Sequence, residues 1–332
     1  MNIEQLSEKL LDKENLSIEE TQDLFRAIMD GKIDDIKISE ILTRLADKGE
    51  VSDEITGGAN ILREKSIKVT LNIEALDMCG TGGDGKHTLN ISTASSIVLS
   101  SMGIAVAKHG NKALTSKSGS ADVLEKLNID ILKNPEEIKK NIEEKGFGFM
   151  FAPNYHLTMK NVANARKQLA RRTIFNLLGP LCNPANACYQ CIGIYSKDLL
   201  EIYAESLMKL GVKKAWVFHS YDGLDEISIF DKTEVFEINN KTLRNFIINP
   251  KEILTKNFKF ADIVGGDSEY NANKIIELFK GKNDAFLEIV SLNSAAGLIV
   301  TNNETELKSA YKNVREHILS GSVMKKYNEL IK

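Results

Sequence analysis

The sequence has little that would suit a membrane protein, a secreted disulfide-rich protein or a general nucleic-acid binder. Its apolar runs are far shorter than the roughly 18–20 residues of a membrane span, and no basic-then-apolar signal pattern opens the chain. Four cysteines in 332 residues do not form a disulfide framework. The net charge of −3 lacks the positive excess of proteins that bind nucleic acid or membrane surfaces. We therefore expect a cytoplasmic enzyme that binds neither nucleic acid nor membrane.

Three of the cysteines lie close together and resemble half of a zinc site. Cys188 and Cys191 have the C-x-x-C spacing of zinc ligands, and Cys182 lies nearby. However, the segment 188–195, CYQCIGIY, is typical of a buried strand, whose successive side chains point to opposite faces. No second ligand pair occurs at zinc spacing. The sequence therefore favours a buried strand over a metal–thiolate site.

The chain divides into a helical N-terminal part and a longer part in which strands and helices alternate. Amphipathic helix patterns fill the first 65 or so residues, and one of them has Ser17 as its expected N-cap with Glu20 three residues later. From about Leu71, short apolar runs alternate with helix patterns, as in a mostly parallel sheet built from βαβ units. We expect a small all-helical domain over 1–68, with a contribution from about 160–185, and an α/β domain over 69–332.

The elements of the α/β part can be assigned to ranges. Strands are predicted over 74–79, 103–108, 147–152, 188–195 and 214–220, and helices over 91–102, 121–127, 159–178, 199–210 and from about 268 onward. The segment EISIFDKTEVFEIN, 226–239, predicts an antiparallel hairpin after the fifth strand. Open α/β sheets bind ligands beyond the carboxyl ends of their strands, so the loops after these strands are the candidate site.

A glycine-rich loop, CGTGGDGKHTLNIST, follows the first predicted strand at Cys79. Its glycines leave backbone N–H groups uncovered, and consecutive N–H groups form a concave site for anions. The helix that begins near Asn90–Ser92 points its N-terminal dipole at the same space. A tight turn with Ser/Thr capping is the simpler alternative, and the match of Gly80, Gly82 and Gly85 to G-x-G-x-x-G lacks a dinucleotide-binding context. The loop alone favours phosphate over a plain turn.

The loop after the second strand strengthens the case for phosphate. Lys108, His109 and Asn111 follow the strand directly, and a serine- and glycine-rich run, 116–120, precedes the next helix. Lysine supplies a positive charge suited to phosphate, while small hydroxyl residues supply close donors. Two such loops on neighbouring strands predict a ligand with two phosphate groups.

Acidic and basic side chains follow two further strands. Asp225 and Glu226, the acidic pair, lie after the fifth strand and form either an exposed turn or a Mg²⁺ site completed by phosphates. Their position at a strand end favours the metal. Arg166 lies in the predicted helix after the third strand, and together with Arg171 and Arg172 it forms either a solvated helix face or a fork for a planar carboxylate.

Six motifs occur in the order and spacing of one known family. They are CGTGGDG, NIST, KHGN, SKSGSADVLE, RTIFNLLGPLCNPA and DGLDEIS. With these motifs the chain resembles the anthranilate phosphoribosyltransferase family of tryptophan biosynthesis, from about Glu4 to the C-terminus. The resemblance implies the fold shared with pyrimidine nucleoside phosphorylases and a homodimer that contacts through the helical domain. It also implies transfer of the phosphoribosyl group of phosphoribosyl pyrophosphate (PRPP) to the amine of anthranilate, with release of pyrophosphate.

The resemblance further implies which residues form the sites. For PRPP they are Gly80, Gly83, Asp84, Thr88, Asn90, Ile91, Ser92, Thr93, Lys108, His109, Gly110, Asn111, Lys112, Ala113, Leu114, Thr115, Ser116 and Ser120. For anthranilate they are Gly80, Asn111 and Arg166, with His109, His156 and Pro180 lining its approach. The resemblance also implies two magnesium ions per monomer, with Ser92, Asp225 and Glu226 as their ligands. An aromatic amine is uncharged at neutral pH and already nucleophilic, so no general base is predicted.

A few residues depart from the family pattern, and two alternative functions remain. Thr115 stands where serine is usual, Leu157 lies in HLTM where HPAM is commoner, and Ser220-Tyr221 replaces a glycine-containing turn. A pyrimidine nucleoside phosphorylase typically has KHSTGG where this chain has KHGN. A non-catalytic nucleic-acid-binding relative has lost donor motifs that this chain keeps, and it is basic rather than acidic. Both alternatives fit the residues less well.

Overall fold

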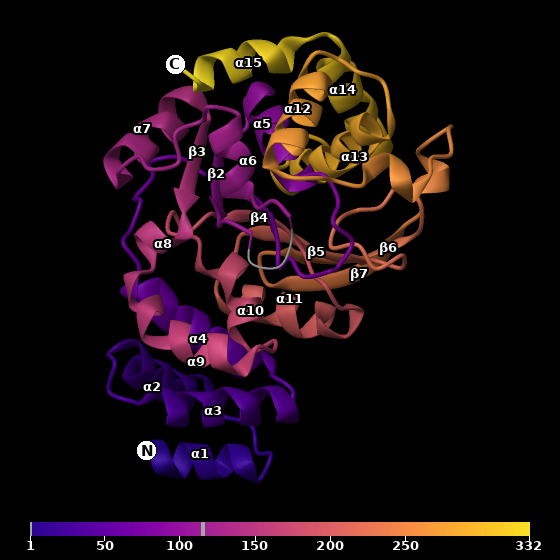
Figure 1. Cartoon of the computed structure of the whole chain (residues 1–332). Coiled ribbons are helices and arrows are strands. Elements are labelled where there is room, and N and C mark those ends of the chain that lie inside the picture. Colours follow the sequence, from indigo (N-terminus) through magenta and orange to yellow (C-terminus); the bar gives the residue numbers. More distant parts are fainter. Residues whose placement is uncertain (1, 114–116) are drawn as a thin grey trace.

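The protein has a helical part at one end and a larger α/β part built on a seven-stranded sheet (Figure 1). The computed structural model describes residues 2–113 and 117–332, so Leu114, Thr115 and Ser116 of the predicted donor loop lie outside the described residues. None of the described helices has the length and apolar character that a membrane crossing requires. A small helical unit beside an α/β unit with a mostly parallel sheet confirms the predicted fold class.

Four N-terminal helices and two later ones form the helical part. The first four are α1 (Ile3–Leu11), α2 (Ile18–Met29), α3 (Asp35–Lys48) and α4 (Ser52–Lys65). The later two, α9 (Lys160–Leu169) and α10 (Phe175–Leu178), return from the α/β part, α9 packing on α2 and α3 and α10 on α4. The predicted capping box of α2 is present, since Glu20 N donates to Ser17 Oγ and Ser17 N donates to Glu20 Oε2.

Five parallel strands and an antiparallel pair form the sheet, in the order β3-β2-β1-β4-β5-β6-β7. The parallel strands are β1 (Leu76–Gly80), β2 (Val106–Gly110), β3 (Phe147–Phe151), β4 (Tyr189–Gly193) and β5 (Lys214–Ser220). The antiparallel strands are β6 (Thr233–Asn239) and β7 (Thr242–Ile248). The strand order reverses at β1, between β2 and β4, and α/β sheets bind ligands in the crevice beyond the strand ends at such a reversal.

Helices cover both faces of the sheet, which explains the continuous apolar strands. Cys191 and Trp216 pack in one core with the fully buried α13 (Ala285–Val300), while Ile192 and Val217 pack in the other with α11 (Leu200–Lys209). The remaining helices are α5 (Ile91–Ser101), α6 (Ser120–Lys126), α7 (Pro135–Lys145), α8 (Ala152–Tyr155), α12 (Ser268–Phe279), α14 (Leu307–Leu319) and α15 (Ser322–Leu330).

Cys191 lies in β4 as the strand interpretation predicts, whereas Cys188 lies just before the strand and packs against the same core. All four cysteines are free, and Cys191 is buried in the core of the sheet. Within the described part of the chain, no group of three or more His, Cys, Asp or Glu side chains could hold a metal ion.

The predicted helix over 159–178 is wrong in its second half. Helix α9 ends at Leu169, because Ala170 adopts the left-handed conformation with φ of +47°, and α10 begins only at Phe175. Arg171 and Arg172 therefore lie on a connection between two helices and do not form a solvated helix face with Arg166.

The predicted antiparallel hairpin after the fifth strand is present, but it is shifted along the chain, because only the second half of 226–239 forms a strand. Its strands are β6 and β7, joined at Asn240, which adopts φ of +54°. The first half of the predicted hairpin is instead a loop, and Ser228 Oγ in it donates to Asp222 Oδ2 at 2.5 Å. Local side-chain bonds of this kind compete with strand pairing.

Candidate active site

The loops after β1, β4 and β5 are tied together at the carboxyl edge of the sheet. Thr81 N donates to Gly193 O at 2.9 Å, and Gly82 N donates to Asp225 Oδ2 at 3.0 Å. A methyl group on Gly193 would lie 1.6 Å from Asp225 O, and one on Gly80 would lie 2.5 Å from Asp225 Oδ2. Both strand ends therefore require glycine, because the loop of the acidic pair crosses directly over them.

The glycine-rich loop has the open backbone that its sequence predicts. Gly82, Gly83 and Gly85 adopt φ of +65°, +80° and +72°, and all three are exposed. Arg172 donates from Nη2 to Gly83 O, and its guanidinium lies 3.9 Å from the centroid of the Tyr195 ring. The connection after α9 thus holds the tip of the loop, a contact that the sequence did not reveal.

Helix α5 begins at the end of this loop and directs its first turn toward the acidic pair. Its first residue is Ile91, with Asn90 at the N-cap position. The backbone of Ser92 lies beside the carboxylate of Glu226, so the predicted metal ligands from two loops face each other. Thr88, just before the helix, forms a β-bridge with Val264, and Thr93 is buried in the first turn.

Three carboxylates, those of Asp84, Asp225 and Glu226, interact near the ends of β1 and β4. Burial, followed by the charge of the facing Asp84, raises the pKa of Asp225 to about 7. Burial and the adjacent Asp225 raise the pKa of Glu226 well above its ordinary value. The buried Lys108 donates from Nζ to Met78 O and supplies an opposing positive charge. Like charges held this closely would be stabilised by a bound cation.

The loop after β2 is closed by a carboxylate at the start of α6. Asp122 Oδ2 accepts from Ala113 N at 2.8 Å and from Gly119 N at 2.9 Å. Ser120 Oγ donates to Asn111 O at 3.3 Å, and the exposed Asn111 side chain accepts from the backbone of the next residue. The two ends of the predicted donor loop are therefore held beside each other.

Two uncharged histidines lie at the ends of β2 and β3. The ring centroids of His109 and His156 are 5.1 Å apart, and each residue is 7% exposed. Burial lowers the pKa of His109 to about 3 and that of His156 to about 4. A backbone carbonyl beside each ring, that of Gly179 for His109 and that of Cys182 for His156, opposes this lowering of the pKa. At neutral pH the pair forms an uncharged wall.

The segment GPLCNP, which carries Pro180, is held by buried amides. Gln190 Nε2 donates to Pro180 O at 3.0 Å, and Asn183 Nδ2 donates to Asp77 Oδ2 at 2.7 Å. The other carboxylate oxygen of Asp77 accepts from His109 N at 3.3 Å. Gln190 thus fixes Pro180, while Asn183 and Asp77 fix the backbone of His109.

Arg166 brings a positive charge from the helical part. Its guanidinium lies 5.3 Å from the centroid of the Phe175 ring, and the side chain is half-buried. Burial lowers the pKa of Arg166, but a guanidinium remains charged at neutral pH. This charge suits an anionic ligand.

Asn293, on α13, holds the residue that follows the acidic pair. Its Oδ1 accepts from Ile227 N at 2.9 Å, and its Nδ2 donates to Ile227 O at 2.9 Å. Asn293 is fully buried within an apolar helix of the core, so no sequence pattern marked it as part of the site. Together with the Asp222–Ser228 contact, it fixes the loop of the acidic pair on both sides.

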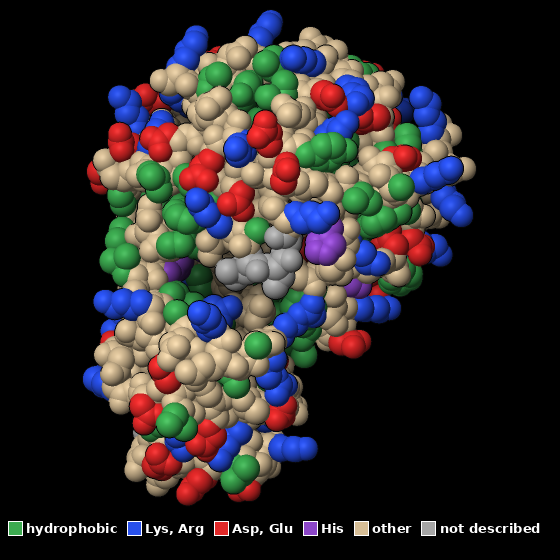
Figure 2. All heavy atoms as spheres, viewed as in Figure 1, with side chains coloured by type: hydrophobic (Ala, Val, Ile, Leu, Met, Phe, Trp, Pro, Cys, Tyr) green, Lys and Arg blue, Asp and Glu red, His purple; other side chains and the backbone are tan. Residues whose placement is uncertain are grey.

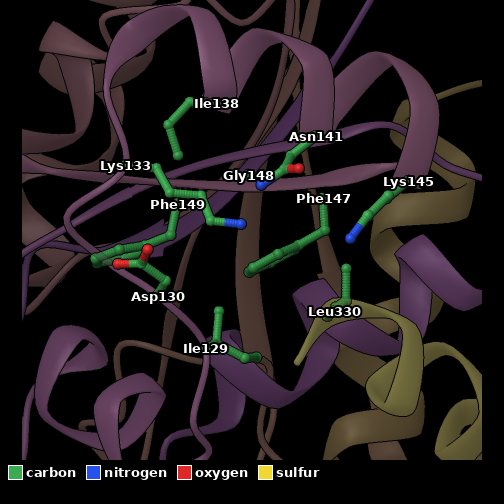
Figure 3. Close-up of a pocket in the computed structure, with 10 residues that line it drawn as sticks. All are labelled: Ile129, Asp130, Lys133, Ile138, Asn141, Lys145, Phe147, Gly148, Phe149 and Leu330. Carbon is green, nitrogen blue, oxygen red and sulfur yellow. The ribbon is translucent and has the colours of Figure 1, made fainter. Parts of the chain in front are cut away.

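Figure 2 shows the surface hollowed between the helical part and the rest of the molecule, with lysine and arginine side chains around the hollow. The cavity in Figure 3 lies elsewhere, among α7, β3 and the end of α15. Its volume of about 10 Å³ has room for a single water molecule. A second cavity of about 260 Å³ lies beside Tyr311 and Arg315. Neither is lined by a predicted site residue.

Two family profiles match the chain. The glycosyl transferase family helical bundle domain matches residues 4–66, and the glycosyl transferase family a/b domain matches residues 72–324. An anthranilate phosphoribosyltransferase of Pelagibacter ubique is 49% identical over 323 residues, which cover 97% of each chain. That of a Thermoanaerobacter species is 43% identical over 330 residues, 99% of this chain and 98% of its own. The chain belongs to the anthranilate phosphoribosyltransferase family.

Solved structures of anthranilate phosphoribosyltransferases share the fold. The enzyme from Thermus thermophilus superposes with a TM-score of 0.93 at 35% identity and covers 98% of both chains. The enzyme from Saccharomyces cerevisiae, in complex with PRPP and Mg, has a TM-score of 0.91 at 28% identity, over 99% of this chain and 96% of its own. Another structure of the yeast enzyme contains 4-fluoroanthranilate. The family transfers a phosphoribosyl group, which makes the chain a glycosyltransferase.

Proposed function

We propose that the chain transfers the phosphoribosyl group of PRPP to the amine of anthranilate, giving N-(5-phosphoribosyl)anthranilate and pyrophosphate in tryptophan biosynthesis. The main observation behind this proposal is that the glycine-rich loop, the start of α5 and the acidic pair meet at one sheet edge, where Gly82 N donates to Asp225. Open backbone N–H groups suit phosphates, and neighbouring carboxylates suit the metal ion that phosphates bind. The PRPP and Mg complex of the yeast relative supports the same ligands.

The donor is proposed to lie along the loops after β1 and β2. Its residues are those that the family resemblance implies: Gly80, Gly83, Asp84, Thr88, Asn90–Thr93, Lys108–Ser116 and Ser120. Positive φ at Gly83 and the open first turn of α5 support this assignment.

The acidic side of the site fits magnesium. Ser92, Asp225 and Glu226 would hold it, as two ions per monomer, and Mg²⁺ ordinarily takes one or two carboxylates and completes its shell with water and phosphate oxygens. Burial, followed by the charge of a neighbouring carboxylate, raises the pKa of both carboxyl groups, and a bound cation would favour their ionised forms. Bound there, magnesium would neutralise the negative charge of the departing pyrophosphate.

Arg166 is proposed to hold the anthranilate carboxylate through its guanidinium fork, while Asn111 aligns the amine. His109, His156 and Pro180 line the approach, and their lack of charge leaves Arg166 to select an acid. The amine nitrogen bonds to the anomeric carbon as the bond to the pyrophosphate oxygen breaks, and the nitrogen then releases a proton. Catalysis by this chain is therefore chiefly positional and electrostatic.

A fluorescence assay tests the function. Protein, PRPP, Mg²⁺ and anthranilate are mixed, and the loss of anthranilate fluorescence is followed. Loss that requires all of these components is the expected result. Phosphate-dependent cleavage of thymidine, without loss of anthranilate, would identify a pyrimidine nucleoside phosphorylase and overturn the proposal.

We also propose the domain boundary at 68/69, a homodimer through the helical domain and a cytoplasmic location. The helical bundle profile, which covers 4–66, supports the boundary. Ile36 on α3 is 82% exposed, which leaves an apolar side chain of the helical part available for a dimer contact. Free cysteines suit a reducing compartment. Light scattering on Ile36→Lys tests the dimer, and an unchanged mass would contradict this interface.

A further inference from the structure

Helix α5 begins at the proposed donor site without the cap that its own sequence offers. Asn90 occupies the N-cap position, where an asparagine ordinarily accepts from the N–H of the second or third helical residue. In the described structure its side chain makes no such bond. Ala94 N donates to Asn90 O at 3.0 Å as the first intrahelical bond, so a cap would satisfy the N–H groups of Ser92 or Thr93.

The Asn90 side chain is engaged by a residue on α12. Asn271 Nδ2 donates to Asn90 Oδ1 at 2.8 Å, and Asn90 Nδ2 donates to Ser118 O at 3.3 Å. Asn271 is 1% exposed, and its own oxygen accepts from Gly266 N at 2.8 Å. Because a backbone N–H can only donate, the Asn271 oxygen must face Gly266 and its nitrogen must face Asn90. The oxygen that could cap α5 is thereby turned away from it.

The open first turn already faces an anionic group. The backbone of Ser92 lies beside the Glu226 carboxylate, and α5 is 11 residues long. A helix of this length concentrates partial positive charge at its N-terminus. The uncapped N–H groups are therefore aimed at the space between the glycine-rich loop and the acidic pair.

We infer that Asn271 is a positioning residue for the donor site, which keeps the first turn of α5 open to a donor phosphate by holding the Asn90 side chain away from it. The inference rests on the proposed function and adds to it a residue that lies outside all six motifs. Asn271 acts through Asn90 and does not itself contact the donor.

A double-mutant cycle on donor binding tests the inference, using calorimetry with PRPP and Mg²⁺ in the absence of anthranilate. In Asn271→Ala the freed Asn90 caps α5, and PRPP must displace that cap. We expect about fivefold weaker binding, the factor that corresponds to a typical cap. In the Asn90→Ala background no cap can form, so adding Asn271→Ala should change affinity by less than about twofold. Asn273→Ala, at an exposed position of the same helix, is the control and should bind as the wild type does.

Hydrogen exchange distinguishes a new cap from a general loosening of the fold, because the two change the exchange rate in opposite directions. Without ligand, the amide of Ser92 or Thr93 should exchange more slowly in Asn271→Ala, because the new cap protects it. A general loosening of the fold would instead make both amides exchange faster. If Asn271→Ala does not fold, Asn271→Asp enters the same cycle, since it keeps the acceptor for Gly266 N but cannot donate to Asn90.

Two outcomes would overturn the inference: unchanged PRPP affinity in Asn271→Ala, or an equal loss in the wild-type and Asn90→Ala backgrounds. An equal loss would mean that Asn271 acts through Gly266 or through general packing. A wild-type protein that binds neither PRPP nor pyrophosphate would overturn the proposed function instead, so the two failures are distinguishable.

Discussion

Replacing Gly80 by alanine should abolish most activity while leaving most of the stability of the fold. The added methyl would lie 2.5 Å from Asp225 Oδ2, about 1 Å closer than an ordinary non-bonded contact. The obstructing atom is the end of a side chain, so the carboxylate can turn aside without moving a strand. Turning it breaks the 3.0 Å hydrogen bond from Gly82 N and displaces a proposed magnesium ligand by about 1 Å. A displacement of that size can cost about 100-fold in rate.

The assay is anthranilate fluorescence at saturating PRPP and Mg²⁺, combined with thermal unfolding of the same variant. We expect kcat to fall about 100-fold and the unfolding midpoint to fall by about 3 °C. Gly193→Ala is the steric comparison, because its methyl would lie 1.6 Å from a backbone oxygen that cannot turn aside, so stability should fall as well. Wild-type kcat in Gly80→Ala would refute the reasoning that the placement of Asp225 limits turnover.

Three further predictions concern the charges of the site. Asp225→Asn combined with Glu226→Gln should abolish Mg²⁺-dependent turnover yet raise the unfolding midpoint of the ligand-free protein at pH 8. Burial raises the pKa of both carboxylates, so their ionised forms destabilise the fold as pH rises; an unchanged midpoint would contradict this. Arg166→Lys should raise KM for anthranilate on the order of tenfold and leave KM for PRPP unchanged, because an ammonium lacks the guanidinium fork; steady-state kinetics with each substrate varied decides. His109 and His156 have lowered pKa values of about 3 and about 4 in the folded protein. As pH falls below about 6.5, both histidines therefore become protonated in the unfolded chain while they remain neutral in the folded protein. Urea unfolding should then show about 2 kcal/mol less stability per histidine at pH 5 than at pH 7, and a KM for anthranilate that titrates near pH 6.5 would argue against neutral rings.

Those parts of the fold that depend on local patterns were predictable. The five parallel strands lie where their apolar runs predicted them, and the capping box at Ser17 and Glu20 is present. The glycine-rich loop and the acidic pair meet because both follow parallel strands, whose carboxyl ends share one edge. The existence of the strands and the positions of these loops therefore follow from residues that are close in sequence, whereas the strand order depends on distant pairings such as that of β1 with β4.

Features that depend on distant contacts could not be predicted. Asn293 lies 66 positions beyond Ile227, and Asn271 lies 181 positions beyond Asn90, so each pairing exists only after α12 and α13 dock. The break at Ala170 was hidden because alanine is an excellent helix former, and its left-handed conformation is imposed by the surrounding structure. The hairpin was displaced because Ser228 bonds a side chain within its own loop.

The break after α9 places two arginines with different partners on one short stretch of chain. Arg166, the proposed acceptor ligand, lies beside Phe175, whereas Arg172 holds Gly83 of the glycine-rich loop. A ligand that fixes one end of this stretch lowers the conformational entropy of its backbone. A second ligand that binds at the other end then loses less entropy on binding. Donor and acceptor should therefore bind with positive cooperativity, each strengthening the other by the same factor. Ala170, between the two arginines, is the position at which a substitution should change that factor more than either affinity alone.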